Sequence, residues 1–212
     1  MKYRLIIFDM DGTLADSFPW FTGVLNSVAQ RFGFRQVAAH EVETLRGLGS
    51  REILDWLGVP LWKVPLIARH MRVLKTQALD SIPLFPGVPA TLADLADRNV
   101  AIAIVSSDSA DNVRRALGPA NARLIAHFAC GSSMFGKPAK FRSVLRRSGI
   151  PAAQAIAIGD ETRDAEAAHA AAHAAGITFG AVGWGYSHIA ALRPHAPDYV
   201  FCSFDDIIAQ LA

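Results

Sequence analysis

The chain has 212 residues, a formal net charge of +2 and a hydrophobic fraction of 51%. This length and composition suffice for a packed interior, either as one large domain or as a core with an insertion. The near-neutral charge and the lack of basic runs with interleaved aromatic residues argue against nucleic acid as a partner. No uncharged run approaches membrane-spanning length, so a membrane is not expected as a partner either. Cys130 and Cys202 are expected to be buried free thiols, which suits a reducing cytoplasm.

The first predicted element is a buried strand that ends in two carboxylates. Residues 5–8 are apolar and partly β-branched, and Asp9, Asp11, Gly12 and Thr13 follow. Alternate residues of an extended chain point to the same side, so Asp9 and Asp11 can face one substrate, while Gly12 allows a tight turn. Paired acids need a balancing cation, and Mg²⁺ prefers such oxygen ligands beside phosphate. The alternative is an Asp-Gly hairpin turn, but the next residues resemble a helix entry rather than a second strand.

Residues 17–83 are predicted to be helical throughout. Apolar residues recur at helical spacing in segments 17–33, 38–49, 50–58 and 61–79, and strand signals are lacking. Ser50 is expected to cap the third segment, and Pro65 indicates a break or restart in the fourth. We interpret residues 17–83 as a helical cap inserted into a core made of residues 1–16 and 84–212.

The rest of the chain alternates between strand and helix patterns. Strands are expected at residues 100–105, 128–130, 155–158, 178–182 and 199–201, and helices at 90–98, 110–117, 139–148, 164–175 and from 205 onward. This alternation predicts an α/β fold with right-handed crossovers, a Rossmann-like doubly wound parallel sheet. Ligands of such sheets bind at the carboxyl ends of the strands.

Of two further polar motifs, one follows a predicted strand and the other precedes a predicted helix. Ser106 and Ser107 follow the strand at 100–105, where a hydroxyl and nearby backbone amides can bind a phosphate, although Ser-rich turns are ordinary. Lys137, in the segment Phe135-Gly136-Lys137-Pro138, supplies a compact positive charge that a phosphoryl group in transfer needs. A surface lysine is the ordinary alternative, and Lys140 is the second candidate for the same role.

The last motif reads Gly159-Asp160-Glu161-Thr162-Arg163-Asp164, directly after the strand at 155–158. Asp160 and Asp164 are four residues apart at a helix start, which can place both carboxylates on one side. Helix capping is the alternative interpretation, since acids are favoured in a first turn. Capping alone would not require Gly159-Asp160 at the strand end plus a second Asp at position 164.

Together these motifs resemble those of the haloacid dehalogenase superfamily of phosphotransferases. The segment Asp9–Ser17 (DMDGTLADS) resembles its first motif, and Ser106, Lys137 and the segment from Gly159 to Asp164 resemble the second, third and fourth in the same order. The resemblance covers essentially the whole chain and is strongest to the phosphoglycolate phosphatase group. Ser107 departs from many relatives, which carry Asn there.

The resemblance implies a role for each matching residue. Asp9 would attack phosphorus to give an aspartyl-phosphate, and Asp11 would act as general acid and base. Ser106 and Lys137 would hold and neutralise the phosphoryl group. The implied Mg²⁺ ligands are Asp9, the Asp11 carbonyl, Asp160 and Asp164. Further phosphate or substrate contacts are expected from Gly12, Thr13, Ser107, Arg46 and Gly47.

We therefore predict a cytoplasmic, magnesium-dependent phosphatase of a small phosphorylated metabolite of the phosphoglycolate or sugar-phosphate type, a monomer or homodimer. A β-phosphoglucomutase-like enzyme and a non-catalytic binding module on the same fold stay open, while a dehalogenase is disfavoured because Asp11 and the metal-site acids suit phosphate chemistry. His169 and His173 have zinc-ligand spacing but no third ligand in pattern, so zinc is not expected. The segment from Gly183 to Tyr186 is either a loop near the mouth of the site or a surface aromatic packed on the sheet.

Overall fold

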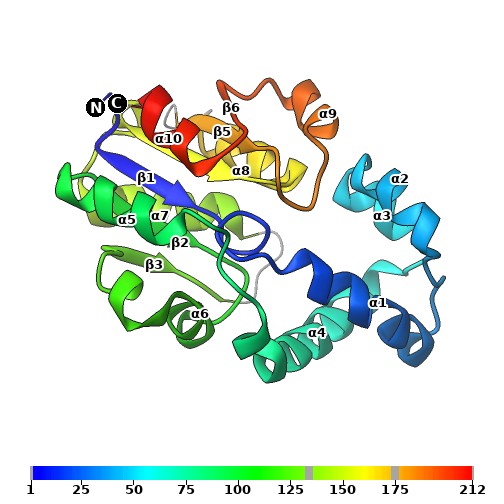
Figure 1. Ribbon diagram of the computed structural model, residues 1–212. Helices are drawn as coiled ribbons and strands as arrows, with labels where there is room; N and C mark the ends of the chain where they lie inside the picture. The colour runs from blue at the N-terminus through cyan, green and yellow to red at the C-terminus, as the bar shows by residue number, and fades with distance from the viewer. Residues whose placement is uncertain (1, 132–135, 173–176, 212) are drawn as a thin grey trace.

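The computed structural model describes residues 2–131, 136–172 and 177–211. Within these ranges the core is a six-stranded sheet with strand order β3-β2-β1-β4-β5-β6, in which every neighbouring pair is parallel (Figure 1). The strands are β1 Leu5–Phe8, β2 Ala101–Val105, β3 His127–Ala129, β4 Ala155–Gly159, β5 Thr178–Val182 and β6 Tyr199–Phe201. The carboxyl ends of all strands therefore meet at one edge. The predicted α/β class with a Rossmann-like parallel sheet is confirmed.

Helices cover both faces of the sheet. The helices after residue 84 are α5 Val88–Asp97, α6 Ala110–Ala122, α7 Lys137–Ser148, η4 Ala152–Gln154, α8 Thr162–Ala172, α9 Ile189–Leu192, η5 Arg193–His195 and α10 Phe204–Leu211, where η marks a short 3₁₀ helix. Ile6 and Phe8 of β1 pack in one apolar cluster with residues of α5, α6 and α10. Leu5 and Ile7 pack in the other cluster with residues of α7, α8 and α9. Because β1 is buried on both faces, all four of its residues are apolar.

Residues 18–81 form a separate group of helices beside the carboxyl edge of the sheet (Figure 1). They are α1 Phe18–Phe32, η1 Ala39–Glu41, α2 Val42–Arg46, α3 Ser50–Trp56, η2 Leu61–Lys63, α4 Val64–Ala78 and η3 Leu79–Ser81. This fully described segment contains no strand and has its own apolar cluster, which includes Leu45 and Leu57. Its two connections to the core run side by side, because Asp16 N–H donates to the Pro83 carbonyl at 2.9 Å. The division into core and cap domains stays a prediction.

Several helix boundaries differ from the predicted ones for local reasons. Gly49, not Ser50, is the N-cap of α3, and its N–H donates to Glu52 Oε2 at 2.7 Å. A restart near Pro65 was expected, and the structure has a short 3₁₀ helix, η2, followed by α4, with Pro65 in the first turn of α4. The short helix α9 was not predicted, since its four residues offer too little periodicity.

The cysteines are free, as predicted, but their expected burial is wrong. Cys130 is half-buried and Cys202 is exposed. Cys202 lies just beyond the end of β6, in a turn where its N–H donates to Asp206 Oδ2 at 2.8 Å, so it does not share the burial of the strand.

Across the described ranges, none of the helices combines the length and apolar character required to cross a bilayer.

Candidate active site

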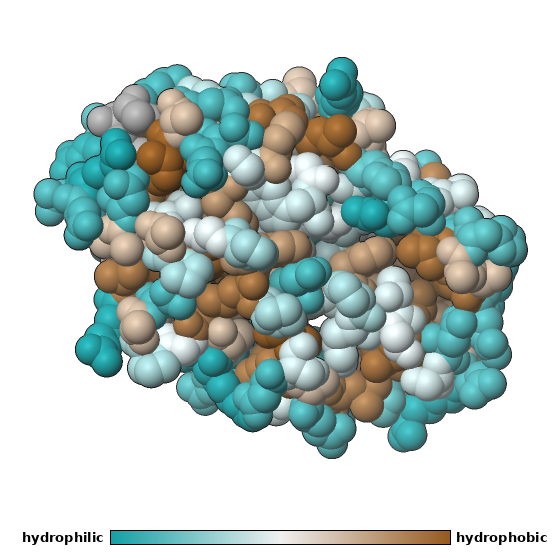
Figure 2. All heavy atoms as spheres, in the orientation of Figure 1, coloured by the Kyte–Doolittle hydropathy of each residue, from teal (hydrophilic) through white to brown (hydrophobic). Residues whose placement is uncertain are grey.

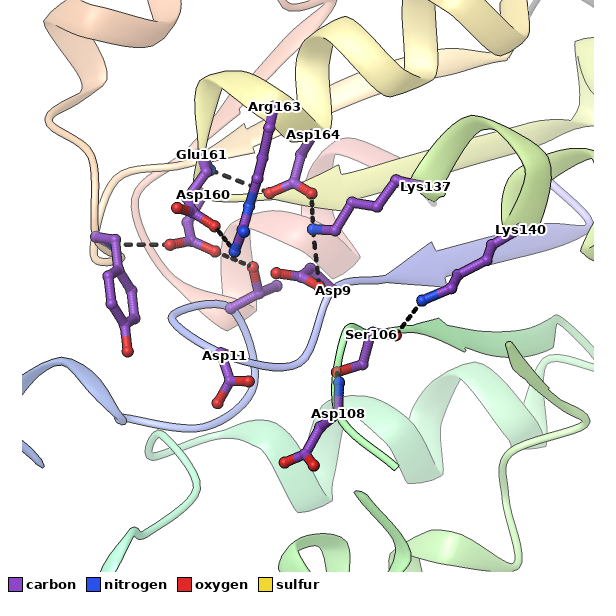
Figure 3. Close-up of polar contacts among 12 residues, drawn as sticks. Asp9, Asp11, Ser106, Asp108, Lys137, Lys140, Asp160, Glu161, Arg163 and Asp164 are labelled. Carbon is purple, nitrogen blue, oxygen red and sulfur yellow. Dashed lines mark hydrogen bonds and ion pairs between the residues drawn. The ribbon is translucent and has the colours of Figure 1, made fainter. Parts of the chain in front are cut away.

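Three carboxylates converge at the centre of the carboxyl edge (Figure 3). Asp9 directly follows β1, and its N–H extends the strand pairing by donating to the Ile158 carbonyl at 2.9 Å. Asp160 follows β4, and Asp164 lies in the first turn of α8. All three side chains are buried, and one oxygen of each lies within 4.8 Å of the others. The structure therefore brings together acids that are about 150 residues apart in the chain, as β1 and β4 are neighbours.

The Asp160 carboxylate is fixed by two hydrogen bonds and two glycines. Thr13 Oγ1 donates to Asp160 Oδ1 at 2.7 Å, and Tyr186 N–H donates to Oδ2 at 2.8 Å. A Cβ atom on Gly12, which has φ +78°, would lie 2.2 Å from Asp160 Oδ2. A Cβ on Gly185 would lie 2.1 Å from Asp160 Cβ. Both loops must therefore carry glycine to approach this carboxylate.

Lys137 supplies positive charge to the carboxylates. It is the first residue of α7, and its Nζ lies 3.0 Å from Asp9 Oδ1 and also contacts Asp164 Oδ1. Burial disfavours the charged ammonium, but the two carboxylates outweigh it and raise the pKa of Lys137. Burial also raises the pKa of Asp9 to about 7 against the opposing effect of Lys137, and it raises the pKa of Asp160 well above its ordinary value. The positive charges of Lys137 and Arg163 therefore do not offset the effect of burial on Asp9.

This donor set fits a divalent cation. Three buried carboxylates offer only oxygen ligands at close quarters, which is the preference of Mg²⁺. An added double positive charge would favour the ionised form of each acid and so offset the raised pKa values of Asp9 and Asp160. The fit therefore rests on donor chemistry and on charge.

Ser106 lies in the loop after β2, and Lys140 of α7 supports this loop. The buried Ser106 Oγ accepts a hydrogen bond from Asp108 N–H at 3.1 Å. Lys140 Nζ donates to the carbonyls of Ser106 and Gly131, at 2.5 and 2.8 Å. Lys140 thus holds the backbone that carries Ser106, whereas Lys137 is the lysine that reaches the carboxylates.

Lys75 is a site residue that the sequence did not reveal. It lies on α4 of the helical segment, is only 8% exposed, and places Nζ 2.6 Å from the Asp11 carboxylate and 2.9 Å from Asp108 Oδ2. Burial lowers the pKa of Lys75, but Asp11 and Asp108 raise it by a larger amount. The Asp11 side chain therefore pairs with the helical segment and stands apart from the cluster of Asp9, Asp160 and Asp164 (Figure 3).

The loop after β5 contacts both the site and the helical segment. Arg46 donates to the carbonyls of Gly185 and Tyr186, at 2.8 and 3.1 Å, and His188 N–H donates to the Arg46 carbonyl at 2.9 Å. Trp184 Nε1 donates to the Thr13 carbonyl at 3.1 Å. The segment is therefore a loop near the site, and Trp184 also packs against Phe85 and Phe204 at the core, so the aromatic interpretation holds as well. Its contact with Asp160 was not predicted, because a backbone donor leaves no signal in the sequence.

The remaining predicted contacts are distributed around the site. Ser107 lines a cavity together with Asp11, and Gly47 ends α2 next to a second hollow that reaches Lys137. Glu161 contacts the guanidinium of Arg163, and both side chains lie beside Asp160, whose pKa the Glu161 charge helps to raise (Figure 3). The substrate-binding roles of Ser107, Arg46 and Gly47 stay predictions.

Residues 6–182 match the family described as Haloacid dehalogenase-like hydrolase. The chain belongs to this family. It is 31% identical to a phosphoglycolate phosphatase of Synechococcus elongatus over 206 aligned residues. The aligned region covers 97% of this chain and 95% of the relative. It is 26% identical to phosphoglycolate phosphatase 1 of Pseudomonas aeruginosa, over 97% of this chain and 78% of the relative.

Solved structures of haloacid dehalogenase-like proteins share the fold. A predicted phosphatase from Clostridium acetobutylicum superposes with a TM-score of 0.82 at 17% identity, over 99% of this chain and 98% of the other. A predicted phosphoglycolate phosphatase from Haemophilus somnus 129PT gives a TM-score of 0.75 at 24% identity, over 100% and 99%. With the family match, these relatives confirm the predicted family and the enzyme class, a haloacid dehalogenase-like phosphatase.

A few predictions lie outside the described residues. Phe135, His173 and the side chain of His169 are among these. The structure therefore tests neither the pairing of the two histidines nor the start of the third motif.

Proposed function

We propose that the chain is a magnesium-dependent phosphatase of a small phosphomonoester, acting through an aspartyl-phosphate on Asp9. One observation supports this most directly: the buried triad of Asp9, Asp160 and Asp164, with Lys137 Nζ 3.0 Å from Asp9 Oδ1. A carboxylate held at the end of a strand, beside a fixed cation, has the position that a nucleophile toward phosphorus requires.

In this proposal each residue performs a definite step. Asp9 attacks phosphorus in line, and the P–O bond to the leaving group breaks. Asp11 lies two residues after Asp9 in the loop after β1. It gives a proton to the leaving oxygen, and it then takes a proton from the water that hydrolyses the acyl phosphate. Lys137 and the Ser106 hydroxyl bind the phosphoryl oxygens. Asp9, Asp160 and Asp164, with the Asp11 carbonyl, would hold Mg²⁺, which supplies positive charge toward those oxygens.

We also propose that residues 17–83 act as a cap over a core of residues 1–16 and 84–212. The paired connections at Asp16 and Pro83 support this division, because a hinge there would move the helices as one body. Lys75 and Arg46 would fasten the cap in its closed position. The cytoplasmic location and the choice between monomer and homodimer stay predictions.

The test is phosphate release from a panel of small phosphomonoesters, with and without Mg²⁺, using Asp9→Asn as the blank. We expect Mg²⁺-dependent release that falls by at least about a thousandfold in Asp9→Asn, because an amide of similar shape is a poor nucleophile. The exposed Asp97→Asn on α5 is the matched control and should retain full activity. Equal release from Asp9→Asn would refute the role of Asp9, and transfer to a second sugar without free phosphate would indicate a mutase.

A further inference from the structure

An apolar cavity of the helical segment reaches the candidate active site at Asp11. Its volume is about 360 Å³, and its lining includes Asp11, Ser107 and Asp108 of the core together with residues of α1 to α4. Figure 2 shows apolar surface gathered in the hollow between α1 and the helices α2 and α3. Protein interiors rarely leave voids much larger than a water molecule, whereas ligand pockets have roughly 300–1,000 Å³. The cavity therefore has the size of a ligand site.

Most of the lining inside the helical segment is hydrocarbon. Aromatic and aliphatic side chains of α1, the loop after it and α4 contribute, among them Phe18, Phe21, Phe34, Ile67 and Met71. Thr22 and Ser50 are the uncharged polar side chains of the helical segment among the described lining residues, and Thr22 Oγ1 already donates to the carbonyls of Phe18 and Pro19. Such a wall offers few partners to sugar hydroxyls, and burying them unpaired is unfavourable.

The charged lining residues are concentrated toward the core and are mostly paired within the chain. Lys75 pairs with Asp11 and Asp108, and Arg163 contacts Glu161. Arg46 is engaged by Glu43 and by backbone carbonyls. Phosphoglycolate, the substrate in the relatives' names, carries a carboxylate on a two-carbon body. Such a group would compete with these internal partners or pair with Arg72, the remaining cation of the lining, and it would leave most of the apolar volume unfilled.

We infer that the substrate is a phosphomonoester with an apolar leaving group, alkyl or aryl, whose body lies in this cavity while its phosphate faces Asp9. The inference deepens the proposed function and rests on it for the chemistry of the phosphate. Continuity of the cavity with Asp11 and Asp108 carries the argument, since an occupant of the apolar end places its ester oxygen toward the core. Each methylene buried there adds about 0.8 kcal/mol of binding, about a fourfold gain in kcat/KM.

The experiment compares methyl, butyl, hexyl and phenyl phosphate with phosphoglycolate. We expect kcat/KM to rise about fourfold per methylene from methyl to hexyl phosphate and phosphoglycolate to be the poorer substrate. Ala68→Leu fills part of the cavity from α4 and should lower the hexyl-to-methyl ratio of kcat/KM at least tenfold. Ala90→Leu, the same change at an exposed position of α5 outside the cavity, should leave that ratio unchanged.

Two results would overturn the inference while leaving a phosphatase. One is a kcat/KM that does not depend on chain length. The other is a preference for phosphoglycolate that Arg72→Gln selectively abolishes, because Arg72 is the further cation of the lining. If no ester releases phosphate, the proposed function fails, and calorimetry with methyl-, butyl- and hexylphosphonate then decides the cavity question. Affinity that rises with chain length supports an apolar ligand, and equal affinities exclude it.

Discussion

The ammonium group of Lys75 lies 2.6 Å from the carboxylate of Asp11, and this contact joins helix α4 to the loop after β1. Asp108, on the loop after β2, takes part at 2.9 Å, so one buried lysine connects the helical segment to two strand ends. If Asp11 is the general acid, its orientation depends on the position of the helical segment. A closed cap and an ordered general acid would then be parts of one arrangement.

We predict that Lys75→Met lowers both stability and turnover. Removing one partner of a buried ion pair costs about 3–5 kcal/mol, and the partial exposure of Asp11 reduces this to about 2 kcal/mol. Urea unfolding measures the loss, and kcat should fall about tenfold or more because Asp11 loses its anchor. Arg98→Met is the control, since it breaks the exposed pair with Asp94 and should change stability by less than about 1 kcal/mol. Identical urea midpoints for the two variants would contradict the prediction.

We predict that Gly185→Ala weakens Mg²⁺ binding about 10- to 100-fold, although this residue is not a candidate ligand. The new Cβ would lie 2.1 Å from Asp160 Cβ, so the carboxylate or the loop must move. Titration calorimetry with Mg²⁺ gives the affinity directly. Gly23→Ala is the matched control, because its Cβ would meet no atom within 4 Å and lies in helix α1. An unchanged Mg²⁺ affinity in Gly185→Ala would show that Asp160 is not positioned by this packing.

The sequence predicted the acids and the lysine at the strand ends but not the residues that hold them. Asp9 and Asp160 directly follow apolar strands, and parallel strands end at a common edge, so their approach follows from topology. Lys137 was placed by its motif. Lys75 lies in α4, and its burial against Asp11 and Asp108 depends on how the helical segment docks, which local periodicity does not encode.

We predict that Asp160→Asn preserves the fold and weakens Mg²⁺ binding at least about tenfold. The asparagine oxygen can still accept from Tyr186 N–H, and its amide group can donate to the Thr13 hydroxyl, which is able to accept. The local hydrogen bonds therefore survive while one negative charge is lost. Circular dichroism should be unchanged, and the Mg²⁺ concentration for half-maximal activity should rise. The exposed Asp205→Asn serves as control, and an equal Mg²⁺ requirement in the two variants would remove Asp160 from the metal site.

Finally, we predict that the metal-free protein loses stability as pH rises and that Mg²⁺ restores it. Burial raises the pKa of Asp9 from 3.8 to about 7, so between these values the folded state binds more protons than the unfolded chain. This contribution to stability is complete below the unfolded pKa and is lost as pH rises through about 7. Asp160, whose pKa is also raised, acts in the same direction.

Mg²⁺ binds the ionised carboxylates, so its effect on stability has the opposite pH dependence. At about 100 times its Kd it adds ~2.7 kcal/mol, which corresponds to a Tm increase of roughly 5–11 °C for a chain of this size. Scanning calorimetry at about pH 6 and about pH 8, with EDTA or with MgCl₂, should show the larger Mg²⁺ shift at the higher pH. Asp9→Asn should reduce that difference, because one of the titrating ligands is then absent. A Mg²⁺ shift that is equal at both pH values, or larger at the lower one, would mean that the buried acids are not the groups that bind the metal.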